Sequence, residues 1–162
     1  MTEFTHLGDK DGVHMVDVSS KSVTERSAVA EGVVHLGSAA YVALMEQRIA
    51  KGNVLTTAQL AGIMGAKDTA RLIPMCHQIP LNAVDIAFSF NAHAHTIKIQ
   101  ATVTSYARTG VEMEALTAVS VAALSMYDMC KSISKAIRIT DIRLITKEGG
   151  KHGPYSVKDL SQ

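Results

Sequence analysis

The chain has no tryptophan, only two cysteines and only three prolines in 162 residues, and aromatic residues make up 4% of it. Cys76 and Cys130 lie far apart and form no CxxC pair, so neither a disulfide framework nor a zinc knuckle is indicated. No apolar run approaches the roughly 18 residues of a membrane span, and residues 1–6 lack the pattern of a signal sequence. We therefore expect a cytoplasmic protein with reduced thiols.

An excess of charge is also absent. Sixteen Lys and Arg residues oppose fifteen Asp and Glu residues, so no overall field attracts nucleic acid or a membrane surface, and any anion site must be local. With 47% hydrophobic and 19% charged residues, the chain can bury a core. We predict a single domain over residues 1–162, with an extended segment at 1–20 and a flexible tail at 149–162.

Helical and period-two patterns alternate between these ends. Period-two alternation predicts strands at 22–36, 82–90, 96–105 and 137–146. Helix-forming composition with start and stop signals predicts helices at 39–51, from 56 onward, and at 112–134. This order predicts an α+β fold, namely a ferredoxin-like βαββαβ sandwich with an extra helix and an antiparallel sheet that carries helices on one face. We expect Val, Ile and Phe with Thr, Ser and Gln on the other sheet face, and association of subunits through it.

Basic, thiol and imidazole groups gather in the loop at 67–81, which Pro74 and Pro80 stiffen. A rigid loop can hold His77 for proton transfer, since imidazole titrates near neutral pH, but a half-buried histidine in a stiff turn explains the pattern equally well. Cys76 beside His77 suggests a nucleophile. Adjacent residues of an extended segment point to opposite sides, however, which argues against thiol catalysis.

The long helix carries charge at both ends, with Glu112 and Glu114 at its start and Asp128 and Lys131 near its end. Such charges can simply complement the helix dipole or pair on the surface. Asp128 and Lys131 nevertheless interrupt an apolar segment, and an acid beside an amine can exchange protons. Glu114 and Asp128 are separated by four turns, or roughly 21 Å. A small ligand that uses both ends therefore requires a site shared between subunits.

Five ordered motifs resemble one known family: MVDVS at 15–19, KDTARLIPMCH at 67–77, GVEMEALTA at 110–118, YDMCK at 127–131 and GGK at 149–151. Together they resemble the cyclic pyranopterin monophosphate synthases, the MoaC family of molybdenum cofactor biosynthesis, over about 14–153. The resemblance implies a ferredoxin-like subunit in a homohexamer, a trimer of dimers with active sites at a subunit interface. It also implies a phosphorus–oxygen lyase that converts (8S)-3′,8-cyclo-7,8-dihydroguanosine 5′-triphosphate, made by an upstream radical SAM GTP cyclase, to cyclic pyranopterin monophosphate and pyrophosphate.

The same resemblance assigns roles to residues. It implies that Asp128 is the catalytic acid or base and that Lys51 and Lys131 are the catalytic lysines. The implied substrate contacts are Met75, Cys76, His77, Met113 and Glu114, with Glu112 as a further acceptor for the pterin and with Arg26, Lys21, Lys67 and Lys147 as part of the field around the triphosphate. We expect clustered ammonium groups to lower lysine pKa values, so that a lysine can carry a proton near neutrality.

The family pattern requires no cofactor, and the sequence leaves open whether magnesium accompanies the triphosphate. One departure from the pattern is Gln78, where the family usually has proline after the Cys-His pair. An RNA-binding module is the main alternative, but its strands would offer chiefly Phe88 and Phe90 for base stacking, and core packing explains both. A metal site built from Cys76, His77, Cys130 and one of His93 or His95 lacks short ligand spacing.

Overall fold

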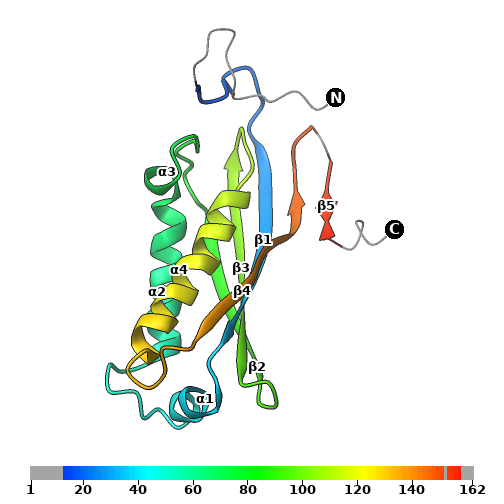
Figure 1. Cartoon of the computed structure of the whole chain (residues 1–162). Coiled ribbons are helices and arrows are strands. Elements are labelled where there is room, and N and C mark those ends of the chain that lie inside the picture. The colour runs from blue at the N-terminus through cyan, green and yellow to red at the C-terminus, as the bar shows by residue number, and fades with distance from the viewer. Residues whose placement is uncertain (1–12, 152, 158–162) are drawn as a thin grey trace.

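The computed structural model describes residues 13–151 and 153–157, which form one sheet and four helices. In chain order the elements are β1 (Thr24–His35), α1 (Ser38–Met45), α2 (Val54–Lys67), α3 (Thr69–Leu72), β2 (Ala83–Asn91), β3 (Thr96–Ala107), α4 (Glu112–Cys130), β4 (Arg138–Glu148) and β5 (Tyr155–Ser156). The strands are antiparallel in the order β2-β3-β1-β4-β5, and α2 and α4 cover one face of the sheet (Figure 1). The predicted α+β, ferredoxin-like architecture is confirmed.

The core lies between the sheet and the two long helices. Alternate residues of β1, such as Ala28, Ala30 and Val34, are fully buried beneath α4 because side chains on a strand alternate between its two faces. Gly32 continues this row, and a Cβ atom there would lie 2.8 Å from Cγ1 of Val119. A glycine is therefore required for α4 to lie as close to the sheet as it does.

The opposite face of the sheet has no helix over it. Instead of the expected isoleucine and phenylalanine, its central strands present valine and threonine around one buried carboxylate, Glu31. Arg143 donates from Nε and Nη2 to Oε1 of Glu31 at 3.1 and 2.8 Å, and Nζ of Lys98 lies 3.5 Å from Oε2. The isoleucines of β2 and β3 face the helices because the strand register turns them into the core.

Several predicted helix ends were wrong, because local geometry overrides composition there. The first helix ends at Met45 rather than 51, since Gln47 has a φ of 55° and the chain turns away. Gly37 is its N-cap and Ser38 its first helical residue. The second helix starts at Val54 rather than 56, because the side chain of Asn53 caps it by accepting a hydrogen bond from the Thr56 amide at 3.0 Å.

The C-terminal half shows three further differences from the predicted elements. The long helix ends at Cys130 rather than 134, and α3 was not predicted. The last strand extends to Glu148, and β5, within the segment expected to be a flexible tail, pairs with it at Lys147 and Thr146. Residues 1–12, 152 and 158–162, which include much of the expected N-terminal segment and tail, lie outside the described residues. Within the described residues, no helix is long and apolar enough to span a membrane.

Candidate active site

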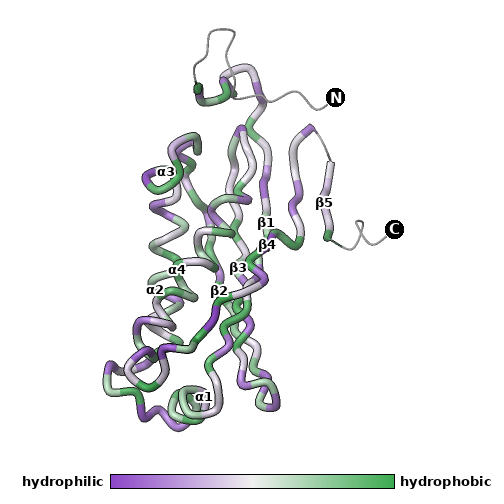
Figure 2. The backbone as a smooth tube through the Cα atoms, viewed as in Figure 1, coloured by the Kyte–Doolittle hydropathy of each residue, from purple (hydrophilic) through white to green (hydrophobic). Residues whose placement is uncertain are grey.

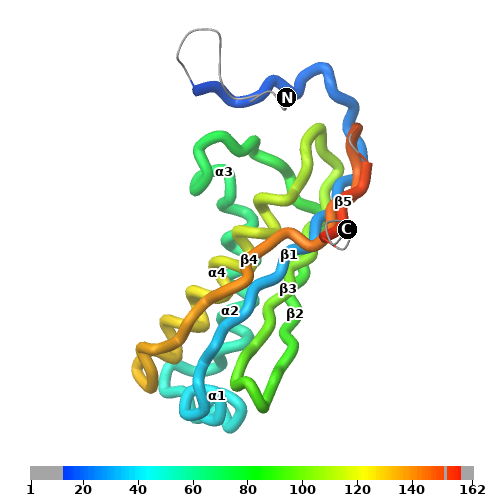
Figure 3. The backbone as a smooth tube through the Cα atoms, turned by 45° about the vertical axis from the view of Figure 1, so that its right-hand side comes forward, coloured from blue at the N-terminus to red at the C-terminus, as the bar shows by residue number. Residues whose placement is uncertain are grey.

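A cavity of about 370 Å³ lies at the start of α4, and we call it the mixed cavity because acidic, basic and apolar side chains line it. Three chain segments meet there: the stretch before β1, the loop after α3 and the first turn of α4. Figure 3 shows the stretch before β1 passing over the end of the molecule where α3 lies. The lining residues are Val16, Val18, Lys21, Met75, Cys76, His77, Ile79, Thr109, Gly110, Glu112, Met113 and Glu114.

His77 ties two of these segments together. Its Nε2 atom lies 2.7 Å from the carbonyl oxygen of Val16, so the ring donates this hydrogen bond and carries a proton on Nε2. Cys76 lines the same cavity, although adjacent residues were expected to point apart, and its amide donates to the carbonyl oxygen of Ile73 at 3.1 Å, so the chain turns just before this pair. Burial and the nearby Glu114 raise the pKa of the Cys76 thiol, which disfavours a thiolate nucleophile.

Glu114 is the most buried acid of the mixed cavity, with 4% of its surface exposed. Burial raises the pKa of this carboxyl above its usual range, and the neighbouring Glu112 acts in the same direction. Glu112 itself accepts a hydrogen bond from Nζ of Lys147 at 2.8 Å. The two acids therefore differ, because Glu112 is held as half of an ion pair while burial raises the pKa of Glu114.

A second cavity, of about 460 Å³, adjoins the first, and we call it the basic cavity. It shares Lys21, Thr109 and Gly110 with the mixed cavity, so the two are continuous. Five cations and no carboxylate line it, which suits a polyphosphate. The lining residues are Lys21, Ser22, Thr24, Arg26, Arg108, Thr109, Gly110, Lys147, Gly149, Gly150 and Lys151.

Arg26 is held rigidly at the back of the basic cavity. It is 9% exposed, and its Nε donates to the carbonyl oxygen of Ala107 at 3.2 Å while Nη2 donates to that of Arg108 at 3.5 Å. Gly150 packs directly against the guanidinium, since a Cβ atom there would lie 2.1 Å from Nη1. The glycine pair at 149–150 thus permits the chain to close over the arginine.

The sequence missed two cations of the basic cavity and included one residue that the structure places elsewhere. Arg108 follows β3 directly and lies two residues before Gly110, so its place between a strand end and a helix start was the available signal. Lys151 completes the GGK motif but was not singled out. Lys67 is exposed in the last turn of α2 and lines neither cavity.

The third group of residues lies at the other end of α4, and we call Lys51, Asp128 and Lys131 the lysine–aspartate cluster. Nζ of Lys51 lies 2.7 Å from Oδ2 of Asp128, and Nζ of Lys131 lies 2.6 Å from Oδ1. Lys51 also donates to the carbonyl oxygen of Asp128 at 2.9 Å. The loop after α1 delivers Lys51, because Gly52 has a φ of 103° and reverses the chain there.

This arrangement sets the charge of the cluster. The hydrogen bonds from Lys131 and then Lys51 lower the pKa of Asp128 to about 2. Asp128 in turn raises the pKa of Lys131. The expectation that clustered amines lower one another's pKa is therefore wrong for Lys131 within one chain, since the Asp128 carboxylate accepts its hydrogen bond and attracts its charge.

The structure separates the three groups into two sites. The mixed and basic cavities lie at the start of α4 and the lysine–aspartate cluster at its end, so the roughly 21 Å between Glu114 and Asp128 remains. Figure 1 shows α4 running the length of the helix layer between them. One chain therefore does not bring the predicted catalytic residues to the predicted substrate contacts.

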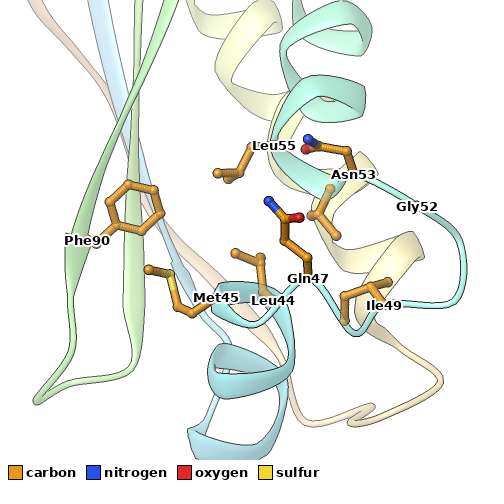
Figure 4. Close-up of a pocket in the computed structure, with 9 residues that line it drawn as sticks. Leu44, Met45, Gln47, Ile49, Gly52, Asn53, Leu55 and Phe90 are labelled. Carbon is orange, nitrogen blue, oxygen red and sulfur yellow. The ribbon is translucent and has the colours of Figure 1, made fainter.

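A further cavity, of about 460 Å³, lies between α1, the start of α2 and β2 (Figure 4). Its lining is mostly apolar, with Leu44, Leu55 and Phe90 around it, and the side chain of Asn53 serves as the cap of α2. It offers no group suited to proton transfer. Among the described residues, no three His, Cys, Asp or Glu side chains lie together as metal ligands.

Comparison with known proteins decides the family. A model of the MoaC family matches residues 15–150. The chain belongs to the MoaC family. It is 53% identical over 154 residues to a cyclic pyranopterin monophosphate synthase of Salinibacter ruber, covering 95% of this chain and 91% of the relative. It is 49% identical over 158 residues to the protein of the same name from Dinoroseobacter shibae, covering 98% and 100%.

Membership in the MoaC family confirms the resemblance that the five motifs indicated. The matched residues include the whole of the mixed cavity, the lysine–aspartate cluster and all of the basic cavity except Lys151. All three groups therefore lie in the part of the chain that the family model describes.

Proposed function

We propose that this MoaC family chain is a cyclic pyranopterin monophosphate synthase, a phosphorus–oxygen lyase of molybdenum cofactor biosynthesis. It converts (8S)-3′,8-cyclo-7,8-dihydroguanosine 5′-triphosphate to cyclic pyranopterin monophosphate and releases pyrophosphate. The observation that carries this proposal is the 53% identity over 95% of the chain to a relative of that name. A cavity lined by five cations beside one lined by acids and an imidazole supports it, because the substrate joins a triphosphate to a purine-derived ring.

The two cavities bind different parts of the substrate, the basic cavity its triphosphate and the mixed cavity its ring. Arg26, Arg108 and Lys147 in the basic cavity neutralise the triphosphate, and the buried Arg26 provides a fork of fixed orientation. In the mixed cavity, Glu112 accepts hydrogen bonds from ring N–H groups, and the buried Glu114 lies beside it to hydrogen-bond the same ring. The His77 ring, anchored on Val16, borders the same space.

The lysine–aspartate cluster handles protons. Asp128 stays ionised and holds both ammonium groups in place, so that Lys131 or Lys51 can donate a proton as bonds break and the phosphate ring closes. In an assembled site the cations of the basic cavity would face these lysines. Their repulsion would counter the effect of Asp128 on Lys131 and lower the pKa of that amine.

These roles require two chains. We propose a homohexamer, a trimer of dimers, in which one chain supplies the two cavities and another the cluster, because a single chain keeps them roughly 21 Å apart. The substrate comes from a radical SAM GTP cyclase acting upstream. The reaction takes place in the cytoplasm, needs no bound cofactor, and is compatible with magnesium entering on the triphosphate.

Mixing two inactive variants tests both the reaction and the sharing of the site. Purified protein should convert the cyclised triphosphate to the pterin product and pyrophosphate, and Lys131→Ala and His77→Ala should each lose this activity. Unfolding and refolding the two variants together should restore about a quarter of wild-type turnover, since half of random pairs are mixed and one of their two sites is intact. Absence of product from the wild type contradicts the proposed function, whereas no recovery on mixing contradicts the shared site.

A further inference from the structure

The residues of β3 that face the helix layer form an apolar row that one hydroxyl interrupts. Ile99, Ala101 and Val103 are fully buried, and the next residue of the row, Ser105, is 1% exposed. The Ser105 hydroxyl donates to the carbonyl oxygen of Pro80 at 2.7 Å. Burying a hydroxyl costs free energy unless it is hydrogen-bonded. Ser105 therefore serves this one contact rather than the apolar packing of its neighbours.

The acceptor of this hydrogen bond belongs to the loop between α3 and β2. Figure 2 shows the chain crossing there from the helix layer to the sheet. The loop brings Cys76 and His77 to the mixed cavity. The His77 ring binds the carbonyl oxygen of Val16, in the stretch before β1, so that contact joins the loop to another irregular segment. Ser105 ties the loop to the sheet itself, at Pro80, three residues after His77.

Ser105 is also next to the residues that build the basic cavity. In the register of β1 and β3 it lies directly opposite Arg26, and both residues are buried on the helix side of the sheet. Two and three residues further along the chain, the carbonyl oxygens of Ala107 and Arg108 accept the hydrogen bonds that hold the Arg26 guanidinium. One short segment, 105–108, therefore holds the loop of the mixed cavity and the buried arginine of the basic cavity.

We propose that Ser105 is a positioning residue whose hydroxyl sets the separation between the mixed cavity and the basic cavity. This inference rests on the proposed function, in which one substrate occupies both cavities. Its ring and its triphosphate are covalently joined, so both ends can bind at once only when the separation of the two cavities matches the substrate. Ser105 lines neither cavity and acts on the substrate through the loop that carries His77.

The two cysteines report on the loop without any substrate. Cys76 lies in the loop, whereas Cys130 is fully buried at the end of α4 and reports on the whole fold. Ser105→Ala should raise the rate at which dithiodipyridine labels Cys76 by roughly 10-fold, because the Pro80 carbonyl loses its buried donor, and should leave the rate at Cys130 within about twofold. Equal acceleration of both thiols would mean that the hydroxyl only stabilises the fold, and an unchanged rate at Cys76 would mean that it does not hold the loop. Either result would overturn the proposal.

Ser120→Ala is the matched control for the labelling experiment. The Ser120 hydroxyl donates to the carbonyl oxygen of Leu116 at 2.8 Å, so the variant loses the same group and the same kind of hydrogen bond, but within α4. The rate of labelling at Cys76 should therefore stay within about twofold of the wild-type rate. If Ser120→Ala accelerated the labelling of Cys76 as much as Ser105→Ala does, the contact with Pro80 would not be the cause and the proposal would fail.

Steady-state kinetics test whether the separation of the cavities matters to the substrate. Ser105→Ala should raise KM for the cyclised triphosphate by roughly 10-fold and leave kcat within about threefold, because the lysine–aspartate cluster is untouched. The Kd for inorganic triphosphate, measured by calorimetry, should stay within about twofold, since Arg26 keeps its carbonyl partners. An unchanged KM, or an equal loss of affinity for inorganic triphosphate, would overturn the proposal. A wild type that makes no product would instead refute the proposed function, and the labelling rates would still show whether Ser105 holds the loop.

Discussion

The two ends of α4 hold carboxyl groups whose pKa values shift in opposite directions. At the start of the helix, Glu114 is 4% exposed, and burial raises its pKa. Four turns later, the side chain of Asp128 is 55% exposed, and two lysines lower its pKa to about 2. Side chains of nearly the same chemistry on one helix thus differ because one lacks water and the other has cations beside it.

The difference between Glu114 and Asp128 suits the start of α4 to binding and its end to proton transfer. A buried acid with a raised pKa suits a neutral ring better than it suits a phosphate. An ionised aspartate between two amines can orient ammonium groups, but the mixed and basic cavities lie at the other end of α4. Each end of α4 is chemically incomplete, so the comparison can be tested by damaging one end at a time.

The largest effect is expected at the lysine–aspartate cluster. Lys131→Ala or Lys51→Ala should lower turnover by at least ~100-fold, the loss typical of a removed acid–base group, while the fold is retained. Steady-state assays with circular dichroism as a check on folding measure this. Lys67→Ala is the control, since Lys67 is exposed and lines neither cavity. Near-normal turnover in Lys131→Ala would remove the cluster from the mechanism.

At the other end, Gly150→Ala should weaken the basic cavity. The glycine has a φ of 90°, and a Cβ atom would lie 2.1 Å from Nη1 of Arg26, so the arginine must leave its carbonyl partners or the tail must lift. The backbone strain alone costs about 1–2 kcal/mol. We expect a higher KM for the triphosphate with a smaller change in kcat.

Gly153→Ala is a matched control for that change. Gly153 has a φ of 71° but no atom within 4 Å of a Cβ, so it brings the strain without the contact. If both variants raise KM equally, strain in the tail is responsible and the packing on Arg26 is not.

Patterns of short range were predictable from the sequence, and contacts across the fold were not. The hairpin of β2 and β3 and the start of α4 at Glu112 match the predicted positions, because alternation and the preceding glycine act locally. The end of α1 depends on Gln47 adopting a positive φ, and β5 depends on β4 lying beside it. The amino-acid composition of α1 or of β5 alone indicates neither condition.

The same limit applies to the candidate site. The start of α4 and the loop at 75–77 were predicted as one substrate site, and they line one cavity. The sequence places Arg108 between a strand end and a helix start but not beside Arg26, because that proximity arises where β3, β1 and the GGK segment meet. The predicted fall in the pKa of Lys131 was wrong, because it depends on a contact that the sequence does not fix. The Asp128 carboxylate lies 2.6 Å from the Lys131 amine and raises its pKa.

A subtler effect concerns stability at the start of α4. Because the folded-state pKa of Glu114 is raised, its contribution to stability is fully present below the unfolded value of 4.5 and is lost as pH rises through the folded value. Glu114→Gln removes this ionisation. The variant should therefore gain stability relative to wild type on going from pH 4 to neutral pH, as measured by urea unfolding. An unchanged difference across that range would show that Glu114 ionises freely.

The smallest effect is expected for Asp128→Asn, and it is spectroscopic. Asp128 raises the pKa of Lys131 through a hydrogen bond and its negative charge, so the amide should let that pKa fall toward its ordinary value of 10.5. An NMR titration of the lysine side chains, assigned with Lys131→Ala, measures this shift without substrate. Glu46→Gln, which removes an acid paired with Arg48 instead, should leave the Lys131 titration unchanged. An unmoved Lys131 pKa in Asp128→Asn would mean that the aspartate does not control the charge of its neighbour, and the contrast between the two ends of α4 would then rest on Glu114 alone.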